Sequence, residues 1–144
     1  MTPAELLRQL NELDERPKIE AKAGSDSGRS ILETVCAFAN EPGMGGGWLL
    51  LGVVPEEQAF WPQYEVVGVP DVEKLQTDLA TQCATMFNGR FGPRMEVAEI
   101  QGKRVVSVFV PEAAASEKPI FFTATGLPKG AYRRIGSADV SCTT

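Results

Sequence analysis

Apolar residues recur at helical spacing in three stretches of the chain. The first, residues 2–13, begins with Thr2 as an N-cap and Pro3 in the first helical position. The second runs from Arg29 to Asn40, and the third follows Asp71, which is placed to cap it. The apolar positions are Leu6, Leu7, Leu10 and Leu13, then Ile31, Leu32, Val35, Cys36, Phe38 and Ala39, and finally Val72, Leu75, Leu79, Cys83 and Phe87. This spacing predicts three amphipathic helices.

Other stretches alternate or are continuously apolar, as strands are. Residues 18–22 alternate with their charged side chains on one side, and residues 48–54 form the most apolar run, which is typical of a central strand covered on both faces. Residues 95–100 and 104–110 flank Gln101-Gly102-Lys103, a strong hairpin signal. Shorter strands are expected at residues 65–69, 120–123 and 131–135. The order α-β-α-β-β-α-β-β-β-β predicts an α/β (α+β) fold, a single compact domain with a mixed sheet covered by about three helices.

Length and composition place this pattern in one domain that spans residues 1–144. Hydrophobic residues make up 43% of the chain, enough for a packed core. No run approaches the roughly 20 apolar residues of a membrane span, and the N-terminus lacks the basic start and apolar centre of a signal peptide. The three cysteines, Cys36, Cys83 and Cys142, form no C-x-x-C pair, which indicates reduced thiols in a cytoplasmic protein.

Two further features of the composition exclude whole classes of chemistry. Histidine is absent, which removes Ser-His and Cys-His catalysis and the commonest transition-metal ligand. The net charge of −5 argues against a surface that grips polyanions by charge alone. Any catalysis would therefore rest on carboxylates, lysines and hydroxyls.

Three segments, in a fixed order, resemble a known family. They are Glu20-Ala21-Lys22, then Ala37-Phe38-Ala39-Asn40 followed by Gly46-Gly47 and Leu49-Leu50-Leu51-Gly52-Val53, and last Tyr132-Arg133-Arg134-Ile135-Gly136-Ser137. With Val67-Gly68-Val69 between them, they span residues 15–137 and resemble the Schlafen AlbA-type domain. The resemblance implies a compact α/β domain that acts as a nucleic-acid-binding module of transcriptional-regulator-like proteins, with further domains C-terminal to Thr144.

The same resemblance implies an alternative chemistry. In some Schlafen relatives clustered acids give metal-dependent RNA cleavage, and Glu15 and Glu20 have the spacing of the first two acids of that cluster. Carboxylates hold Mg²⁺ or Mn²⁺, and Lys22 would stabilise a developing phosphate charge. Glu56 or Glu57 would supply the third ligand, because Pro55 stands where the family has an aspartate. Without this chemistry no cofactor is expected, and the charged strand face is a solvated one with a Glu–Lys pair.

A basic segment near the C-terminus is the best candidate for nucleic-acid contacts. Arginine binds phosphates with two parallel hydrogen bonds, an aromatic ring stacks on an unpaired base, and a helix N-terminus favours anions. The candidates are Lys129, Tyr132, Arg133, Arg134 and, near the start of the second helix, Arg29. Neighbouring strand residues point to opposite faces, so we expect one of Arg133 and Arg134 to face solvent. The other is expected to pair with Glu20 or a neighbour in the sheet.

The glycine turn before the central strand has two interpretations. Gly45, Gly46 and Gly47 would let backbone amides approach a phosphate closely. However, the turn runs from helix to strand and lacks the Gly-Lys-Ser/Thr of a P-loop, which favours a tight connection. We expect Asn40, just before the turn, to cap the helix end.

These observations favour a non-enzymatic module that binds DNA or RNA. One alternative is the divalent-metal-dependent nuclease. Another is a protein-interaction domain without nucleic-acid binding, which the acidic balance makes credible, and self-association into a homo-oligomer is compatible with either. No membrane partner is expected. The family assignment also predicts that Glu20 and Lys22 share one face of a strand adjacent to the strand at residues 48–54.

Overall fold

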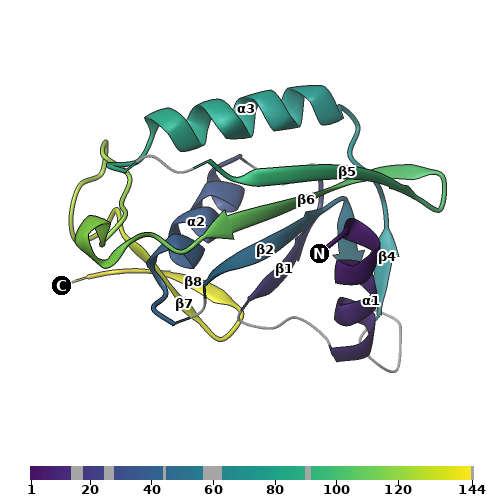
Figure 1. The fold of residues 1–144 in the computed structure, drawn as a ribbon, viewed down its shortest axis with the longest axis horizontal. Coiled ribbons are helices and arrows are strands. Elements are labelled where there is room, and N and C mark those ends of the chain that lie inside the picture. The colour runs from purple at the N-terminus through teal and green to yellow at the C-terminus, as the bar shows by residue number, and fades with distance from the viewer. Residues whose placement is uncertain (14–17, 25–27, 44, 57–62, 90–91, 144) are drawn as a thin grey trace.

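A four-stranded mixed sheet runs through the centre of the molecule (Figure 1). The computed structural model describes residues 1–13, 18–24, 28–43, 45–56, 63–89 and 92–143. The strand order is β1-β2-β6-β5, made of β1 (Ile19–Lys22), β2 (Gly46–Leu51), β6 (Lys103–Pro111) and β5 (Arg94–Ile100). Among the described strands of this sheet, only β1 and β2 pair in parallel; β6 runs antiparallel to both of its neighbours. The predicted mixed sheet is therefore confirmed.

The register of β1 confirms the structural expectation drawn from the family motif. Glu20 lies opposite Leu49 and Lys22 opposite Leu51. The two charged residues alternate with buried Ile19 and Ala21, so they share one face of a strand that adjoins β2.

Three helices cover the sheet, as predicted. Helices α2 (Gly28–Asn40) and α3 (Val72–Thr85) pack on one face, over a core that includes Leu49, Leu51 and the alternate valines of β6. Helix α1 (Pro3–Leu13) packs on the other face, over Leu50 and Ile19. Within the described residues, no helix is both long enough and apolar enough to span a membrane.

The helix caps and the tight hairpin formed as their residues indicated. The Thr2 hydroxyl accepts the Glu5 amide at 3.2 Å, and the Asp71 carboxylate accepts the Lys74 amide at 3.0 Å. The β5–β6 turn places Gln101 and Gly102 at φ +54° and +76°, the left-handed values of a two-residue hairpin turn.

The long apolar strand predicted for residues 48–54 is two strands in different sheets, which corrects that prediction. Gly52 has φ +102°, and a Cβ there would lie 3.1 Å from the Gly68 carbonyl carbon. The chain therefore turns at Gly52, and β3 (Val53–Pro55) leaves the central sheet to pair with β4 (Tyr64–Val66). This small hairpin joins α1 in covering the second face.

The C-terminal part of the chain packs against α2. A hairpin of β7 (Tyr132–Ile135) and β8 (Ala138–Ser141) ends the fold, and β8 was not anticipated from the sequence. The strand predicted at residues 120–123 is absent from this described segment, which makes only isolated bridges at Phe121 and Phe122. A short 3-10 turn, η1 (Ala115–Glu117), precedes it.

The buried side chain of Asn40 takes the place of a partner strand there. Its amide nitrogen donates to the carbonyl oxygens of Ile120 (2.9 Å) and Tyr132 (3.0 Å), and its oxygen accepts the Ile120 amide (2.7 Å). Asn40 thus joins the end of α2 to two C-terminal segments, which differs from the simple helix cap expected.

Replacing Asn40 by alanine should destabilise the fold strongly. The change leaves buried backbone groups at Ile120 and Tyr132 without partners, and we expect the free energy of unfolding to fall by about 2–4 kcal/mol. Asn88 is the matched control: it makes similar bonds to the Pro119 carbonyl (3.1 Å) and the Phe121 amide (2.7 Å), but it is exposed. Urea denaturation should show a much smaller loss for Asn88→Ala. Equal losses would contradict the role given to burial.

Candidate nucleic-acid interface

The two predicted arginines of β7 lie in opposite environments. The Arg134 side chain is fully buried, with Nη1 2.5 Å from Glu20 Oε2 and 2.9 Å from Asp139 Oδ1. The Arg133 side chain is 53% exposed, and its Nε lies 2.8 Å from Glu41 Oε1. The structure therefore shows the pairing with Glu20 that the sequence left open, and shows that Arg134 makes it.

Helix α2 closes the polar cluster around Arg134. The Thr34 hydroxyl contacts the carboxylates of Glu20 and Asp139, and the Lys22 amine donates to the Ser30 hydroxyl at 2.9 Å. Lys22 also lies 3.8 Å from Glu20, and the side chains of this pair are only 10% and 13% exposed. The charged face of β1 is therefore nearly buried, which corrects the expectation of a solvated strand face.

This cluster, which we call the Arg134 clamp (Glu20, Lys22, Ser30, Thr34, Arg134 and Asp139), is closed to external phosphates in this conformation. The Arg134 side chain has no exposed surface, so it is not placed to contact nucleic acid, which differs from the prediction. Its position instead fastens the last hairpin to the first strand and to α2.

The predicted carboxylate site is only partly within the described residues. Glu15 and Glu57 lie outside the described residues. Glu56 is exposed at the end of β3, while Glu20 and Lys22 belong to the clamp. Among the residues that the structure describes, no three acidic or cysteine side chains are grouped to hold a metal ion. The nuclease chemistry of Glu15, Glu20 and Lys22 stays a prediction.

The outward face of the β7–β8 hairpin is exposed and mixed in character. Arg133 lies opposite Val140, and Ile135 opposite Ala138, in the antiparallel register. Ile135 is 63% exposed and Val140 40%. We call these four residues the hairpin face. Hydrogen bonding to Glu41 raises the pKa of Arg133, which keeps the guanidinium charged at any physiological pH.

Arg29 and Tyr132, two further predicted contacts, belong to a stack on the inward side. The Arg29 guanidinium lies 3.7 Å from the centre of the Phe122 ring, and Phe122 meets Tyr132 edge-on at 5.9 Å. Glu33 accepts hydrogen bonds from Arg29 (3.1 Å) and from the Tyr132 hydroxyl (3.2 Å). Tyr132 is half-buried in this stack, whereas the exposed Lys129 lies on the loop before the hairpin.

At the glycine turn, the backbone lies very close to neighbouring groups of the fold. A Cβ on Gly46 would lie 2.0 Å from the Val110 carbonyl oxygen, and one on Gly47 would enter the Phe38 ring at 2.4 Å. The Gly45 amide donates to Glu112 at 2.9 Å. The close approaches require glycine at Gly46 and Gly47, and Gly45 has φ +72°, which favours glycine. These features support the tight connection over a phosphate cradle.

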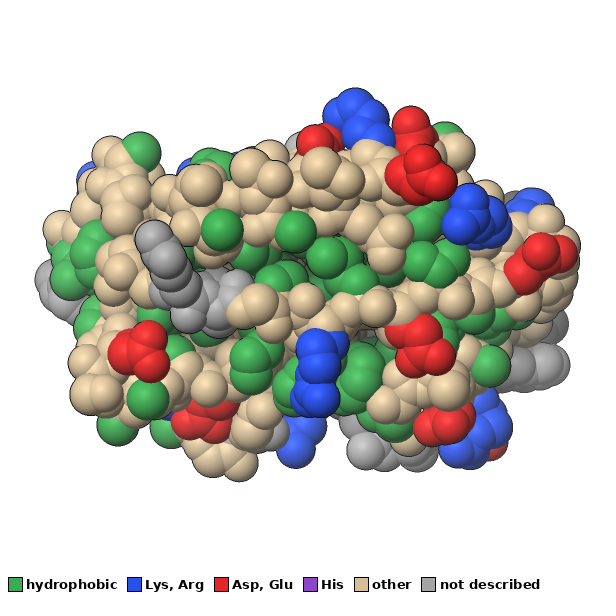
Figure 2. All heavy atoms as spheres, turned by 45° about the horizontal axis from the view of Figure 1, so that its top comes forward, with side chains coloured by type: hydrophobic (Ala, Val, Ile, Leu, Met, Phe, Trp, Pro, Cys, Tyr) green, Lys and Arg blue, Asp and Glu red, His purple; other side chains and the backbone are tan. Residues whose placement is uncertain are grey.

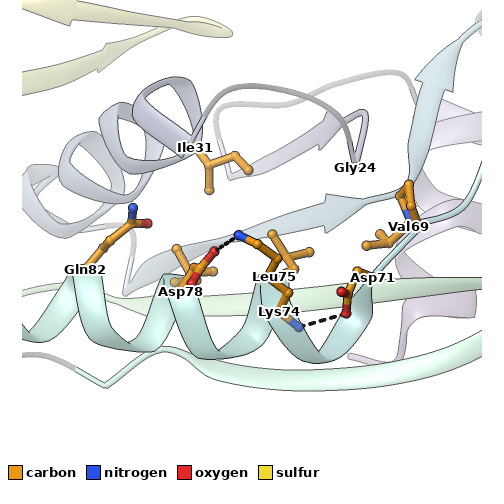
Figure 3. Close-up of a pocket in the computed structure, with 11 residues that line it drawn as sticks. Gly24, Ile31, Val69, Asp71, Lys74, Leu75, Asp78 and Gln82 are labelled. Carbon is orange, nitrogen blue, oxygen red and sulfur yellow. Dashed lines mark hydrogen bonds and ion pairs between the residues drawn. The ribbon is translucent and has the colours of Figure 1, made fainter.

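A cavity of about 360 Å³ lies between the start of α2 and the side of α3 (Figure 3). Its wall is mixed: Ile31, Val69 and Leu75 are directed into it, and charged and polar side chains of α3 also line it. Among the described residues at its rim, the Lys74 amine lies 2.7 Å from the Asp78 carboxylate. The cavity is of ligand size, but this cation is already paired.

Charges of both signs are interspersed on the face that includes α3. Figure 2 shows Lys and Arg side chains next to Asp and Glu side chains across this face, with no continuous basic field. Long-range attraction of a polyanion to this face is therefore not expected.

Comparison with known proteins establishes the family. The Schlafen, AlbA_2 family matches residues 15–143, and the chain belongs to that family. No curated protein matches the chain.

Two solved structures share the fold. The first is the solution NMR structure of the N-terminal domain of a RecG-related protein from Nitrosomonas europaea, described as a putative ATP-dependent DNA helicase. It is 50% identical, with a TM-score of 0.80 over 100% of this chain and 95% of that one. The second is a crystal structure of a Corynebacterium diphtheriae protein, 19% identical, with a TM-score of 0.57. The match to the second covers 96% of this chain but 26% of that protein, and it shows the fold alone.

Several members of the clamp were missed from the sequence. The missed members are Ser30, Thr34 and Asp139, and Asp139 lies 105 residues from Thr34. Such separations leave no local pattern, and Ser30 and Thr34 read simply as polar positions of a helix. Only the alternation of β7 indicated that one arginine would turn inward.

Removing the buried charge of Arg134 should be far more costly than removing that of Arg133. Arg134→Met leaves the carboxylates of Glu20 and Asp139 uncompensated in the interior, and we expect a loss of about 3–5 kcal/mol in the free energy of unfolding. Arg133→Met removes a cation that is half exposed, and the buried Glu41 carboxylate keeps its hydrogen bond from the Arg134 amide, so we expect about 0–1 kcal/mol. Chemical denaturation of the two variants measures the contrast. Similar losses would show that the clamp does not hold the fold.

The Glu112 carboxylate should make stability depend on pH. A hydrogen bond from Lys118 and a second from the Gly45 amide lower its pKa below the ordinary 4.5. Its contribution is therefore present above about pH 4.5 and is lost as the pH falls through the lowered value. Melting temperatures of the wild type and of Glu112→Gln should differ at pH 7 and converge in acid. A constant difference would exclude this linkage.

Proposed function

We propose that this domain binds nucleic acid through the hairpin face, as a non-enzymatic module. The observation that carries the proposal is the exposed guanidinium of Arg133, on a hairpin whose other face is anchored by the Arg134 clamp. Family membership supports it, as does the likeness to a domain of a RecG-related protein that is named for a DNA helicase. Arg133 would exchange Glu41 for a phosphate, and Lys129 would add a second contact.

In this proposal the domain acts in the cytoplasm, as part of a transcriptional-regulator-like protein. All three cysteines are free, and burial raises the pKa of Cys36 and Cys83 to about 12. Thiols of this kind stay protonated and inert, as expected for a reducing compartment.

Fluorescence anisotropy with labelled single-stranded and duplex oligonucleotides tests the proposal. Binding should weaken as salt rises, with a slope of roughly −0.7 per neutralised phosphate for single strands. Arg133→Ala should reduce that slope by about one contact and leave the fold intact.

Lys74→Ala is the matched control, because it removes one charge from an exposed ion pair on α3, away from the hairpin. It should leave affinity and slope unchanged. Absence of binding to DNA and RNA at low salt would overturn the proposal and favour a protein-interaction role.

A further inference from the structure

A row of flat side chains crosses the sheet on the face that carries α1. In the register of the central strands, Trp48 of β2 lies opposite Phe109 of β6, and Phe109 lies opposite Arg94 of β5. The Trp48 and Phe109 ring centres are 4.8 Å apart, and the Arg94 guanidinium lies 4.9 Å from the Phe109 ring centre. We call these three residues the stacking row.

Helix α1 leaves this row accessible. Its side chains Ala4 and Leu7 lie beside Ile100, at the end of the sheet where β5 and β6 are joined. Figure 1 shows α1 near that end, away from the end at which β5 begins and β6 finishes. A cavity of about 470 Å³ opens over the row, with Met1 and Glu96 at its margin.

The side chains of the row are half-buried or exposed, which suits them to a ligand. Trp48 packs partly on the core beneath α1, and both aromatic residues are half-buried. Arg94 is exposed, and no carboxylate among the described residues lies within ion-pair distance of it. The row therefore combines fixed ring surface with a cation that is available to an anion.

We propose that the stacking row binds unpaired bases of a single-stranded nucleic acid. Aromatic rings and the guanidinium plane stack on bases of any sequence, and aromatic residues on neighbouring central strands of a four-stranded sheet are a recurrent way to present them. Arg94 can also reach a backbone phosphate, while the Glu96 carboxylate can accept from a base amino group. Duplex bases are stacked on one another and cannot use this row.

This inference deepens the proposed function, since it specifies single strands, but it uses a different surface. The hairpin face belongs to a hairpin that packs on α2, and the row lies on the opposite face of the sheet. The two surfaces can therefore be tested separately.

Tryptophan fluorescence reports directly on the row. The chain has two tryptophans, so Trp61→Phe leaves Trp48 as the single emitter. In this background we expect saturable quenching by oligothymidylate and oligoadenylate of about ten nucleotides, and little quenching by a duplex of the same length. Phe109→Leu should weaken single-strand affinity about tenfold, because stacking is lost while apolar volume is kept.

Arg94→Ala provides a second variant, because its exposed side chain can be removed without opening the core; we expect it to weaken single-strand affinity several-fold. Circular dichroism of each variant verifies the fold. Lys74→Ala, on α3 and outside both proposed surfaces, serves as the control and should leave the quenching of Trp48 unchanged.

The outcomes separate the two proposals. Binding by anisotropy without quenching of Trp48, and with wild-type affinity in Arg94→Ala and Phe109→Leu, would overturn the stacking row and leave the hairpin face standing. Quenching of Trp48, together with wild-type affinity and salt slope in Arg133→Ala by anisotropy, would support the row and overturn the hairpin face. If neither binding nor quenching is observed, both proposals are overturned.

Discussion

The ion pairs of Arg134 hold together parts of the chain that are far apart in sequence. The guanidinium joins Glu20 on the first strand to Asp139 on the last, and the Thr34 hydroxyl of α2 contacts both carboxylates. Two acids for one buried cation, with added hydrogen bonds, is the arrangement that offsets the cost of removing charges from water. Because it fixes the inward face of β7–β8, the same interaction determines that Arg133 points outward.

A second constraint is the close approach of backbone to side chain at the start of β2. Gly46 leaves room for the Val110 carbonyl, and Gly47 for the ring of Phe38. Helix α2 can therefore lie directly on the sheet, and its last residue, Asn40, reaches the irregular C-terminal segment. The turn is shaped by packing, which explains why glycines there need not bind phosphate.

An acidic domain that binds nucleic acid must rely on local contacts. With a net charge of −5 and interspersed charges on the face in Figure 2, general electrostatic steering is weak. The two proposed surfaces are suited to this condition, since each presents one exposed arginine beside apolar or aromatic side chains. Stacking and directed phosphate contacts depend less on net charge than a basic field does.

The sequence by itself determined the three helices, their caps at Thr2 and Asp71, and the turn between β5 and β6, because these features depend on neighbours within a few residues. It also indicated that one β7 arginine turns inward. Only the tertiary structure decided that the apolar run breaks at Gly52, that an asparagine side chain replaces a strand partner at Ile120, and that Trp48 joins Phe109 on an open face. Each of these depends on partners that folding brings together from distant segments, and separations of that size leave no periodic trace in a single sequence.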